Sequence, residues 1–375
     1  MSLIWPASET DVVTSAPRLH AFIIGVGDYP HLGGGSGAPA VDALGLSQVT
    51  TPRFTAPAIA QWLLGSYVNT ACPLGSIELL VSPATTIPVN GAPIQAAAAT
   101  MNGVRAAFTQ WFNRCGKRAD NVTLFYFCGH GLARVNQYLL PEDFGDPAIP
   151  NRWQNCMDFD GLKVGMRSCA AQTQFFFVDA CRETPFGVLT QLQVQGDPLV
   201  TSTFSDTVAC SSAYYATTQG RQAFGPDNDV TYFGRAPLSC LKGVAAASKF
   251  GKWVVDTYSL SNALGQTMAA MARQHKLPLA CNPDVAGMAP IHEPKGPRVL
   301  ASVECTSDAA NLAAEIVLRN GAVTIQSLAG EPKPLIEEVD AGDWDIEVRF
   351  PGGQFPPFTA REPLTPPVFA GVPVP

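Results

Sequence analysis

The sequence has no run of lysines or arginines, and charged residues make up only 15% of its 375 residues. Its net charge is −7. Nucleic acids and anionic membranes attract proteins that cluster basic side chains, so we expect neither as a partner. No segment approaches the length of an apolar transmembrane helix, and residues 1–10 carry neither a basic leader nor a long apolar stretch. These absences predict a cytoplasmic protein whose partners are polypeptides.

The ten cysteines lack the spacing of a disulfide framework or of a zinc site. Five of the cysteine and histidine residues in the middle of the chain contain no Cys-x-x-Cys or His-x-x-x-His pair, so a structural zinc site is an unfavoured alternative. The residues considered are Cys128, His130, Cys156, Cys169 and Cys181. Several other cysteines lie in apolar segments, which favours reduced thiols in an intracellular protein.

Two pairs of aspartates are candidates for calcium, but neither fits the spacing of an EF-hand loop. They are Asp158 with Asp160 and Asp227 with Asp229. Both pairs are equally typical of turns. We therefore expect no metal ion and no other cofactor.

Hydrophobic residues make up 46% of the chain, and two of its apolar runs end in reactive side chains. Phe125 to Cys128 leads to His130, and Phe175 to Val178 leads to Cys181. Short runs of this kind predict buried strands of a parallel sheet, whose carboxyl ends lie at one edge. A thiol and an imidazole at that edge could perform acyl transfer. The alternative is a buried core histidine with a small, inert cysteine.

The two motifs resemble those of the caspase clan, in which a histidine precedes the strand-terminal cysteine by about fifty residues. Asp179 to Arg182 is more similar to the Asp-x-Cys motif of metacaspases, paracaspases and bacterial caspase-like proteins than to the motif of animal caspases. The flanks His20 to Pro30 and Gln137 to Asp143 are also similar, so the resemblance covers roughly residues 18–285. It implies a caspase-like α/β/α sandwich with a mostly parallel sheet.

The resemblance also implies catalytic roles. Cys181 attacks a peptide carbonyl as a thiolate, with its pKa lowered by His130, which later protonates the leaving amine. The backbone amides of Gly131 and Cys181 hold the oxyanion. The residues alone identify no third group that orients the imidazole.

Asp179 occupies the position that contributes to a pocket for arginine or lysine in the Asp-x-Cys relatives. A second acid of these relatives falls near Thr55 here, so it is absent; Asp28 or Asp42 could substitute, or could be a solvated loop residue. Ser211, in the strand predicted after Cys181, is a further candidate for substrate binding. A basic pocket is favoured, and a neutral pocket for apolar residues remains the alternative.

The chain exceeds the usual size of one domain, and its pattern changes near its carboxyl end. Prolines punctuate residues 286–297, which we predict to be a linker after a peptidase domain at 18–285 and an extension at 1–17. Residues 298–375 alternate apolar and polar residues with turns between them, which predicts a small all-β sandwich.

Within the first domain we predict strands at 19–26, 77–81 and 207–213. Predicted helices cover 56–66 and Asn102 to Cys115, the latter with Asn102 as its N-cap. Residues 183–204 are predicted to form a loop.

Together these features predict a hydrolase, an intracellular thiol endopeptidase that cleaves protein substrates. The resemblance implies limited proteolysis in a bacterial stress, antiviral defence or regulated cell death pathway, with an activating or regulatory protein as partner. The loop after Cys181 has no Lys or Arg until Arg221, so self-processing at a basic residue is not expected there. The alternative is a catalytically silent scaffold, and the C-terminal domain could inhibit the site or recruit partners.

Overall fold

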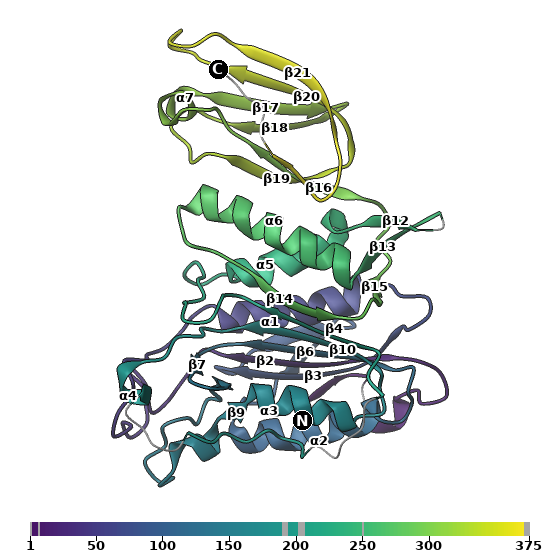
Figure 1. The fold of residues 1–375 in the computed structure, drawn as a ribbon, viewed down its shortest axis with the longest axis vertical. Helices are drawn as coiled ribbons and strands as arrows, with labels where there is room; N and C mark the ends of the chain where they lie inside the picture. The colour runs from purple at the N-terminus through teal and green to yellow at the C-terminus, as the bar shows by residue number, and fades with distance from the viewer. Residues whose placement is uncertain (1, 7, 190–193, 202–206, 250, 371–375) are drawn as a thin grey trace. The chain divides into compact units, whose positions relative to one another are not determined.

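The computed structural model describes residues 2–6, 8–189, 194–201, 207–249 and 251–370 (Figure 1). The chain divides into two compact units, each built from two segments. The first comprises Met1–Arg235 with Cys281–Ala289, and the second Ala236–Ala280 with Pro290–Pro375. This division differs from the predicted domains, because residues 236–280 group with the C-terminal part. The predicted linker itself contains a strand, β15 (Pro290–His292).

A seven-stranded sheet, ordered β1-β3-β2-β6-β10-β11-β14, organises the first unit. The five central strands are parallel, and the edge strands β1 and β14 are antiparallel to their neighbours. In this order the bounds are Leu3–Trp5, Leu74–Ser82, Leu19–Val26, Val122–Cys128, Thr173–Asp179, Cys210–Tyr215 and Asn282–Ala286. The predicted α/β architecture is thus confirmed, and the strand predicted at 207–213 begins three residues later and ends two residues later, as Cys210–Tyr215.

Helices cover both faces of this sheet, with α1 on one face and α2 and α3 on the other (Figure 1). The helices within the unit are α1 (Pro52–Gly65), α2 (Met101–Cys115), α3 (Phe159–Gly165) and α4 (Phe186–Leu189), and α5 (Tyr232–Ser239) crosses its boundary at Arg235. The short α4 lies in the predicted loop; residues 190–193 and 202–204 of that prediction fall outside the described residues. Small sheets complete the unit: β4 (Thr86–Val89) with β5 (Ala92–Gln95), and β7 (Gly131–Ala133), β8 (Gln137–Leu139) and β9 (Met157–Asp158).

The start of α2 corrects one prediction. Thr100 has extended backbone, and its hydroxyl accepts a hydrogen bond from the backbone N–H of Gly103, so Thr100 and not Asn102 is the N-cap. Asn102 lies one residue inside the helix, where its side chain accepts a hydrogen bond from Arg105.

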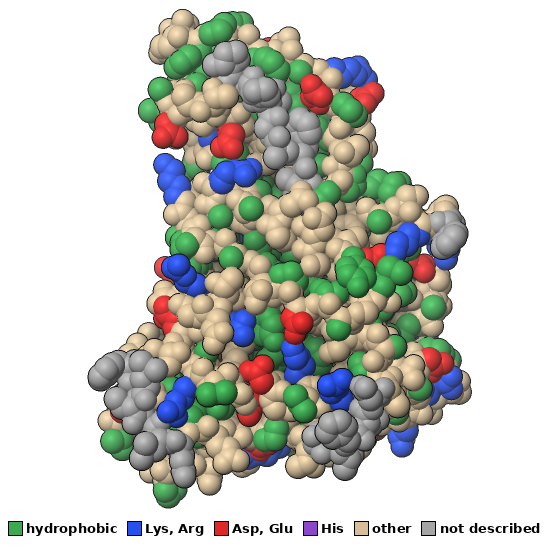
Figure 2. Space-filling view, viewed as in Figure 1, with side chains coloured by type: hydrophobic (Ala, Val, Ile, Leu, Met, Phe, Trp, Pro, Cys, Tyr) green, Lys and Arg blue, Asp and Glu red, His purple; other side chains and the backbone are tan. Residues whose placement is uncertain are grey.

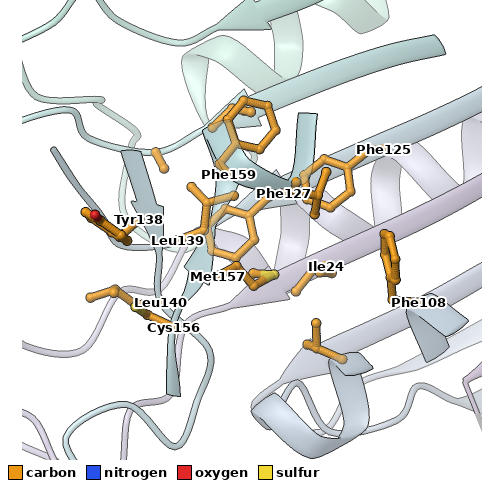
Figure 3. Packing of buried hydrophobic residues seen from close by; sticks show 14 of the residues in the cluster. Ile24, Phe108, Phe125, Phe127, Tyr138, Leu139, Leu140, Cys156, Met157 and Phe159 are labelled. Atoms are coloured by element: carbon orange, nitrogen blue, oxygen red, sulfur yellow. The ribbon is translucent and has the colours of Figure 1, made fainter. Parts of the chain in front are cut away.

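Aromatic side chains from the sheet and from helices α2 and α3 fill the core on the face of the sheet that these two helices cover. Phe125 of β6 lies between Phe22 and Phe159, with ring centroids 5.9 Å from each. Figure 3 shows Phe125 and Phe127 packed with Leu139 and Met157, which come from the small sheet. Large fully buried rings each contribute a few kcal/mol of hydrophobic stabilisation, so the carboxyl end of β6 is firmly anchored.

The second unit contains helix α6 (Thr257–His275), a three-stranded sheet and a β-sandwich. Asp256 caps α6 by accepting hydrogen bonds from two backbone amides, while the hydroxyl of Ser259 accepts one from the backbone N–H of Asp256. The small sheet pairs β12 (Ala247–Lys249), β13 (Lys252–Asp256) and β15.

The predicted all-β sandwich is confirmed within residues 298–370 of this unit. Its two sheets have the strand orders β19-β16-β22 and β18-β17-β20-β21 and enclose a core around Trp344. The elements are β16 (Arg298–Val303), α7 (Asp308–Ala313), β17 (Glu315–Asn320), β18 (Val323–Ser327), β19 (Leu335–Asp340), β20 (Gly342–Arg349), β21 (Phe358–Leu364) and β22 (Val368–Ala370). Through β21 and β22 the Pro-rich segment 358–370 takes part in both sheets.

Charged side chains are scattered over the face drawn in Figure 2, with basic and acidic groups interspersed among uncharged ones. Of the helices in the described part of the chain, none combines the length and the apolar character needed to cross a membrane.

Candidate active site

The predicted nucleophile and base lie at the carboxyl ends of adjacent parallel strands. Cys128 of β6 is in register with Asp179 of β10, and two residues later the chains reach His130 and Cys181. A hydrogen bond from the backbone N–H of Gly129 to the carbonyl of Asp179 (3.2 Å) ties the two strand ends together. His130 and Cys181 line one cavity of about 340 Å³. The sequence-based prediction that they share an edge therefore agrees with this geometry.

A backbone carbonyl orients the imidazole of His130. The Nε2 atom lies 2.6 Å from the carbonyl oxygen of Ser47, so Nε2 carries the proton and donates it. The other ring nitrogen, Nδ1, is then unprotonated and can accept a proton. This third group escaped the sequence analysis because any residue supplies a carbonyl, and Ser47 is remote in the chain.

Cys181 is half-buried and makes two contacts that fix its backbone and its sulfur. Its Sγ accepts a hydrogen bond from the backbone N–H of Ala223 (3.3 Å), and its carbonyl accepts one from the side-chain amide of Gln137 (3.4 Å). A Cβ at Gly131 would lie 2.6 Å from that same carbonyl oxygen. Glycine at position 131 thus makes room for the backbone of Cys181.

Burial changes the protonation of both groups in the same direction, toward neutrality. It raises the pKa of the Cys181 thiol, an effect that the Ala223 amide partly opposes and that Glu183 and Asp179 reinforce. Burial also lowers the pKa of His130, against the effect of its bond to Ser47. At neutral pH the resting pair is therefore a thiol and a neutral imidazole. The expectation that Cys181 rests as a thiolate is corrected accordingly.

Asp179 lies at the floor of the cavity with only 3% of its surface exposed. Its Oδ2 accepts hydrogen bonds from the hydroxyls of Thr231 and Tyr126, the latter at 3.1 Å. Burial raises the pKa of its carboxyl to about 6, although these hydrogen bonds and one from Cys128 lower it. The carboxyl is mostly ionised at pH 7.5, and a cationic group in the cavity would favour the ionised form further.

Other predicted substrate-binding residues lie elsewhere. Asp28 is not among the residues that line the cavity. Ser211 is in register with Gln174 near the amino end of β10, so it lies at the opposite end of the strand from Cys181. Asp42 is ion-paired with Arg152 (4.0 Å) and caps its own turn. The structure therefore brings none of these three side chains to the cavity.

A different acid reaches the cavity. Asp227 lines it together with Asp179, and within the described residues its carboxylate has no ion-pair partner. Thr55 stands at the position of the missing acid, and its hydroxyl accepts a hydrogen bond from the backbone N–H of Thr231 (3.0 Å). The hydroxyl of Thr231 in turn donates a hydrogen bond to Asp179. Asp227 was considered only as a calcium ligand because it lies in a loop whose path the sequence does not predict.

The remaining paired aspartates serve local structure. Asp158 caps α3 and accepts bonds from Asn136, and Asp160 accepts the backbone N–H of Gln137. Asp229 pairs with Arg235. Across the described ranges, no three or more His, Cys, Asp or Glu side chains gather as a metal site requires.

No protein-family model matches the chain. An uncharacterized protein of Sinorhizobium fredii is 28% identical over 184 residues, covering 48% of this chain and 52% of its own length. A protein described as a probable protease, from a Desulfuromonadales bacterium, is 30% identical over 131 residues, covering 34% of this chain and 15% of its own. The chain thus spans about half the length of the first relative and a smaller part of the second.

Among solved structures, caspase-1 from Spodoptera frugiperda is similar to this chain. The similarity covers 72% of this chain and 87% of that chain, with 13% identity and a TM-score of 0.42. The sequence similarity is thus to an uncharacterized protein and to part of a protein described as a probable protease.

Proposed function

We propose that this protein is a cysteine endopeptidase in which Cys181 is the nucleophile and His130 the general base. The observation that carries the proposal is the pairing of the two residues in one cavity, with the imidazole oriented by the Ser47 carbonyl. An imidazole whose Nε2 proton is held elsewhere presents Nδ1 as a proton acceptor, which is what a neutral thiol needs for attack.

The reaction begins with the neutral pair. As Sγ of Cys181 bonds to the peptide carbonyl carbon, the thiol proton passes to Nδ1 of His130, and the carbonyl oxygen becomes an oxyanion. The backbone amides of Gly131 and Cys181 are the proposed donors to that oxyanion. His130 then protonates the leaving amine, and a water deprotonated by His130 hydrolyses the thioester to release the acid.

The proposed specificity is for arginine or lysine before the cleaved bond. Asp179 at the floor and Asp227 in the lining give the cavity two carboxylates. An ionised carboxyl in the cavity would offset the loss of hydration of a cationic side chain, which favours Arg or Lys over neutral residues.

The proposed setting is the bacterial cytoplasm, where limited proteolysis would serve stress, antiviral defence or regulated cell death, under an activating protein. This part of the proposal follows the family resemblance.

The test is cleavage of a mixed peptide library, with new termini identified by mass spectrometry. Cys181→Ala is the inactive variant, and Cys281→Ala, which removes another half-buried free thiol, is its matched control. Cuts after Arg or Lys that vanish only in Cys181→Ala are the expected result. Cuts after apolar residues would reject the acidic pocket and keep the peptidase. Absence of Cys181-dependent cuts, also in cell extract that supplies activators, would favour the scaffold alternative.

A further inference from the structure

Tyr29 follows the carboxyl end of β2 and is completely buried beside His130. Its hydroxyl accepts a hydrogen bond from the backbone N–H of His130 (2.8 Å) and donates one to the carbonyl of Leu140 (3.2 Å). The backbone N–H of Leu140 donates in turn to the carbonyl of His130 (3.1 Å). These three bonds form a closed ring that holds both backbone polar groups of His130.

The side chain of Tyr29 also contacts the imidazole itself. The two ring centroids lie 4.8 Å apart, at an interplanar angle of 43°. Burial raises the pKa of the Tyr29 hydroxyl, so it stays protonated and remains a donor to Leu140 at every physiological pH. The space around the hydroxyl is tight, because a Cβ at Gly129 would lie 2.8 Å from it.

Tyr29 is in turn fixed to the loop that orients the imidazole. The side chain of Gln48 accepts the backbone N–H of Tyr29 (2.8 Å) and donates to the Tyr29 carbonyl (2.9 Å). Gln48 directly follows Ser47, whose carbonyl binds Nε2 of His130. The next residue, Val49, donates its N–H to the carbonyl of Gly27 (2.9 Å). Tyr29 thus links three features of His130: its backbone, the plane of its ring and the loop that supplies the partner of its Nε2 atom.

We propose that Tyr29 is a positioning residue that sets the orientation of the His130 imidazole toward Cys181. The inference rests on the proposed Cys–His function. Catalysis is sensitive to orientation, and a displacement of about 1 Å can slow a reaction about a hundredfold. The hydroxyl of Tyr29 supplies orientation without touching the substrate or the reacting atoms.

The test measures alkylation of Cys181 by iodoacetamide, which needs no knowledge of the natural substrate. In this reaction Sγ bonds to the reagent carbon, iodide leaves, and the thiol proton passes to His130. Cys281 is an internal reference, because it is also half-buried and burial alone raises its pKa to about 12. Peptide mass spectrometry of the full chain at pH 6 to 9 gives the ratio of labelling at Cys181 to that at Cys281.

Tyr29→Phe keeps the ring and removes only the hydroxyl. We expect the labelling ratio at pH 7 to fall about tenfold, and kcat for a peptide found in the library to fall similarly with KM within twofold. Tyr138→Phe is the matched control, since this buried hydroxyl donates to the carbonyl of Val194 (3.0 Å). The control is expected to leave the ratio and kcat unchanged. Gln48→Ala, which frees the backbone of Tyr29, is expected to lower the ratio about threefold and provides a second measurement if Tyr29→Phe folds poorly.

An unchanged ratio in both Tyr29→Phe and Gln48→Ala would overturn the inference, as would an equal loss in Tyr138→Phe. His130→Ala separates this failure from that of the proposed function. If His130→Ala lowers the ratio and neither Tyr29→Phe nor Gln48→Ala does, the Cys–His pair stands and the positioning role is rejected. If His130→Ala itself leaves the ratio unchanged, both are rejected.

Discussion

Replacing Asp179 by asparagine would show whether the buried carboxyl selects the residue before the cleaved bond. The substitution keeps the size of the side chain and a carbonyl oxygen for the hydroxyls of Thr231 and Tyr126. It removes the negative charge at the floor of the cavity. Two peptides that differ only in arginine or its neutral isostere citrulline before the bond then measure what that charge contributes.

The expected magnitude follows from the burial of Asp179, which is 3% exposed. A hydrogen bond to a charged partner contributes about 1.5–3 kcal/mol, roughly 1–2 kcal/mol more than a neutral one. At 1.36 kcal/mol per factor of ten, the ratio of kcat/KM for arginine over citrulline should fall about 5- to 30-fold in Asp179→Asn. The cleavage of the citrulline peptide should change little.

The pH dependence gives a second measure from the same peptides. Because the carboxyl has a pKa near 6 in the free protein, it is neutral below that value and ionised above it. The arginine-to-citrulline ratio of kcat/KM should therefore rise as pH increases from 5 to 7, whereas the titration of His130 affects both peptides alike and cancels. In Asp179→Asn the ratio should be flat. A wild-type ratio near one at all pH values, or a variant that keeps the wild-type ratio, would refute the role of Asp179.

Two further predictions follow. Asp227→Asn should lower kcat/KM for the arginine peptide about threefold and leave the citrulline peptide unchanged. The control Asp229→Asn, which breaks an exposed ion pair, should alter kcat/KM for neither peptide. Equal effects of the two substitutions would contradict a role for Asp227 in the cavity. Burial lowers the pKa of His20 to about 4 in the folded protein. As pH falls below 6.5, His20 therefore becomes protonated in the unfolded chain before it does so in the folded protein. The titration of His20 should therefore contribute a drop of about 2 kcal/mol in the unfolding free energy between pH 7 and pH 5, measured by urea denaturation of Cys181→Ala proteins with and without His20→Asn. His20→Asn should remove most of this drop, and an unchanged pH dependence in that variant would disprove the assignment.

The sequence predicts those parts of the site that strands deliver. An apolar run such as Phe175 to Val178 has to be buried, and burial in a parallel sheet brings the following Asp179 and Cys181 to the carboxyl edge. Prediction stops at groups that loops deliver, because a loop's path depends on contacts remote in sequence. Ser47 and Asp227 enter the site in this way, the former through a carbonyl that every residue carries.

The edge strand β14 and the candidate substrate-binding residue Ser211 were predicted less well, because their places depend on pairing and register between strands. Strand β14 contains Pro283 and Asp284 and has little apolar character, so nothing local marks it as a strand; its pairing with β11 decides it. Ser211 was selected for its place in a predicted neighbouring strand, but only the register shows that it lies at the far end of that strand.

The division of the chain into two units leads to a last prediction, about deleting residues 298–375. Under the predicted domain boundaries this deletion would remove a separate β-sandwich and free the peptidase from a possible inhibitor. Instead, Leu300 of β16 packs in one buried cluster with Ala270 of α6 and with Val244, which ends the short helical segment Cys240–Val244. The deletion would expose these two side chains to water, and exposed apolar clusters promote association. We expect the truncated protein to bind a hydrophobic dye and to aggregate during size-exclusion chromatography at concentrations where the full chain does not.

A monomeric truncated protein with an unchanged unfolding midpoint would contradict this prediction. It would mean that residues 236–280 fold with the first unit and that the domain boundary near residue 298, as predicted from the sequence, is correct. If the truncated protein aggregates, a change in its peptidase activity reflects the loss of packing around α6 and is no measure of inhibition. The regulatory hypothesis then calls for substitutions on the surface of the sandwich, such as Arg361→Ala, which leave the buried cluster intact because Arg361 is exposed.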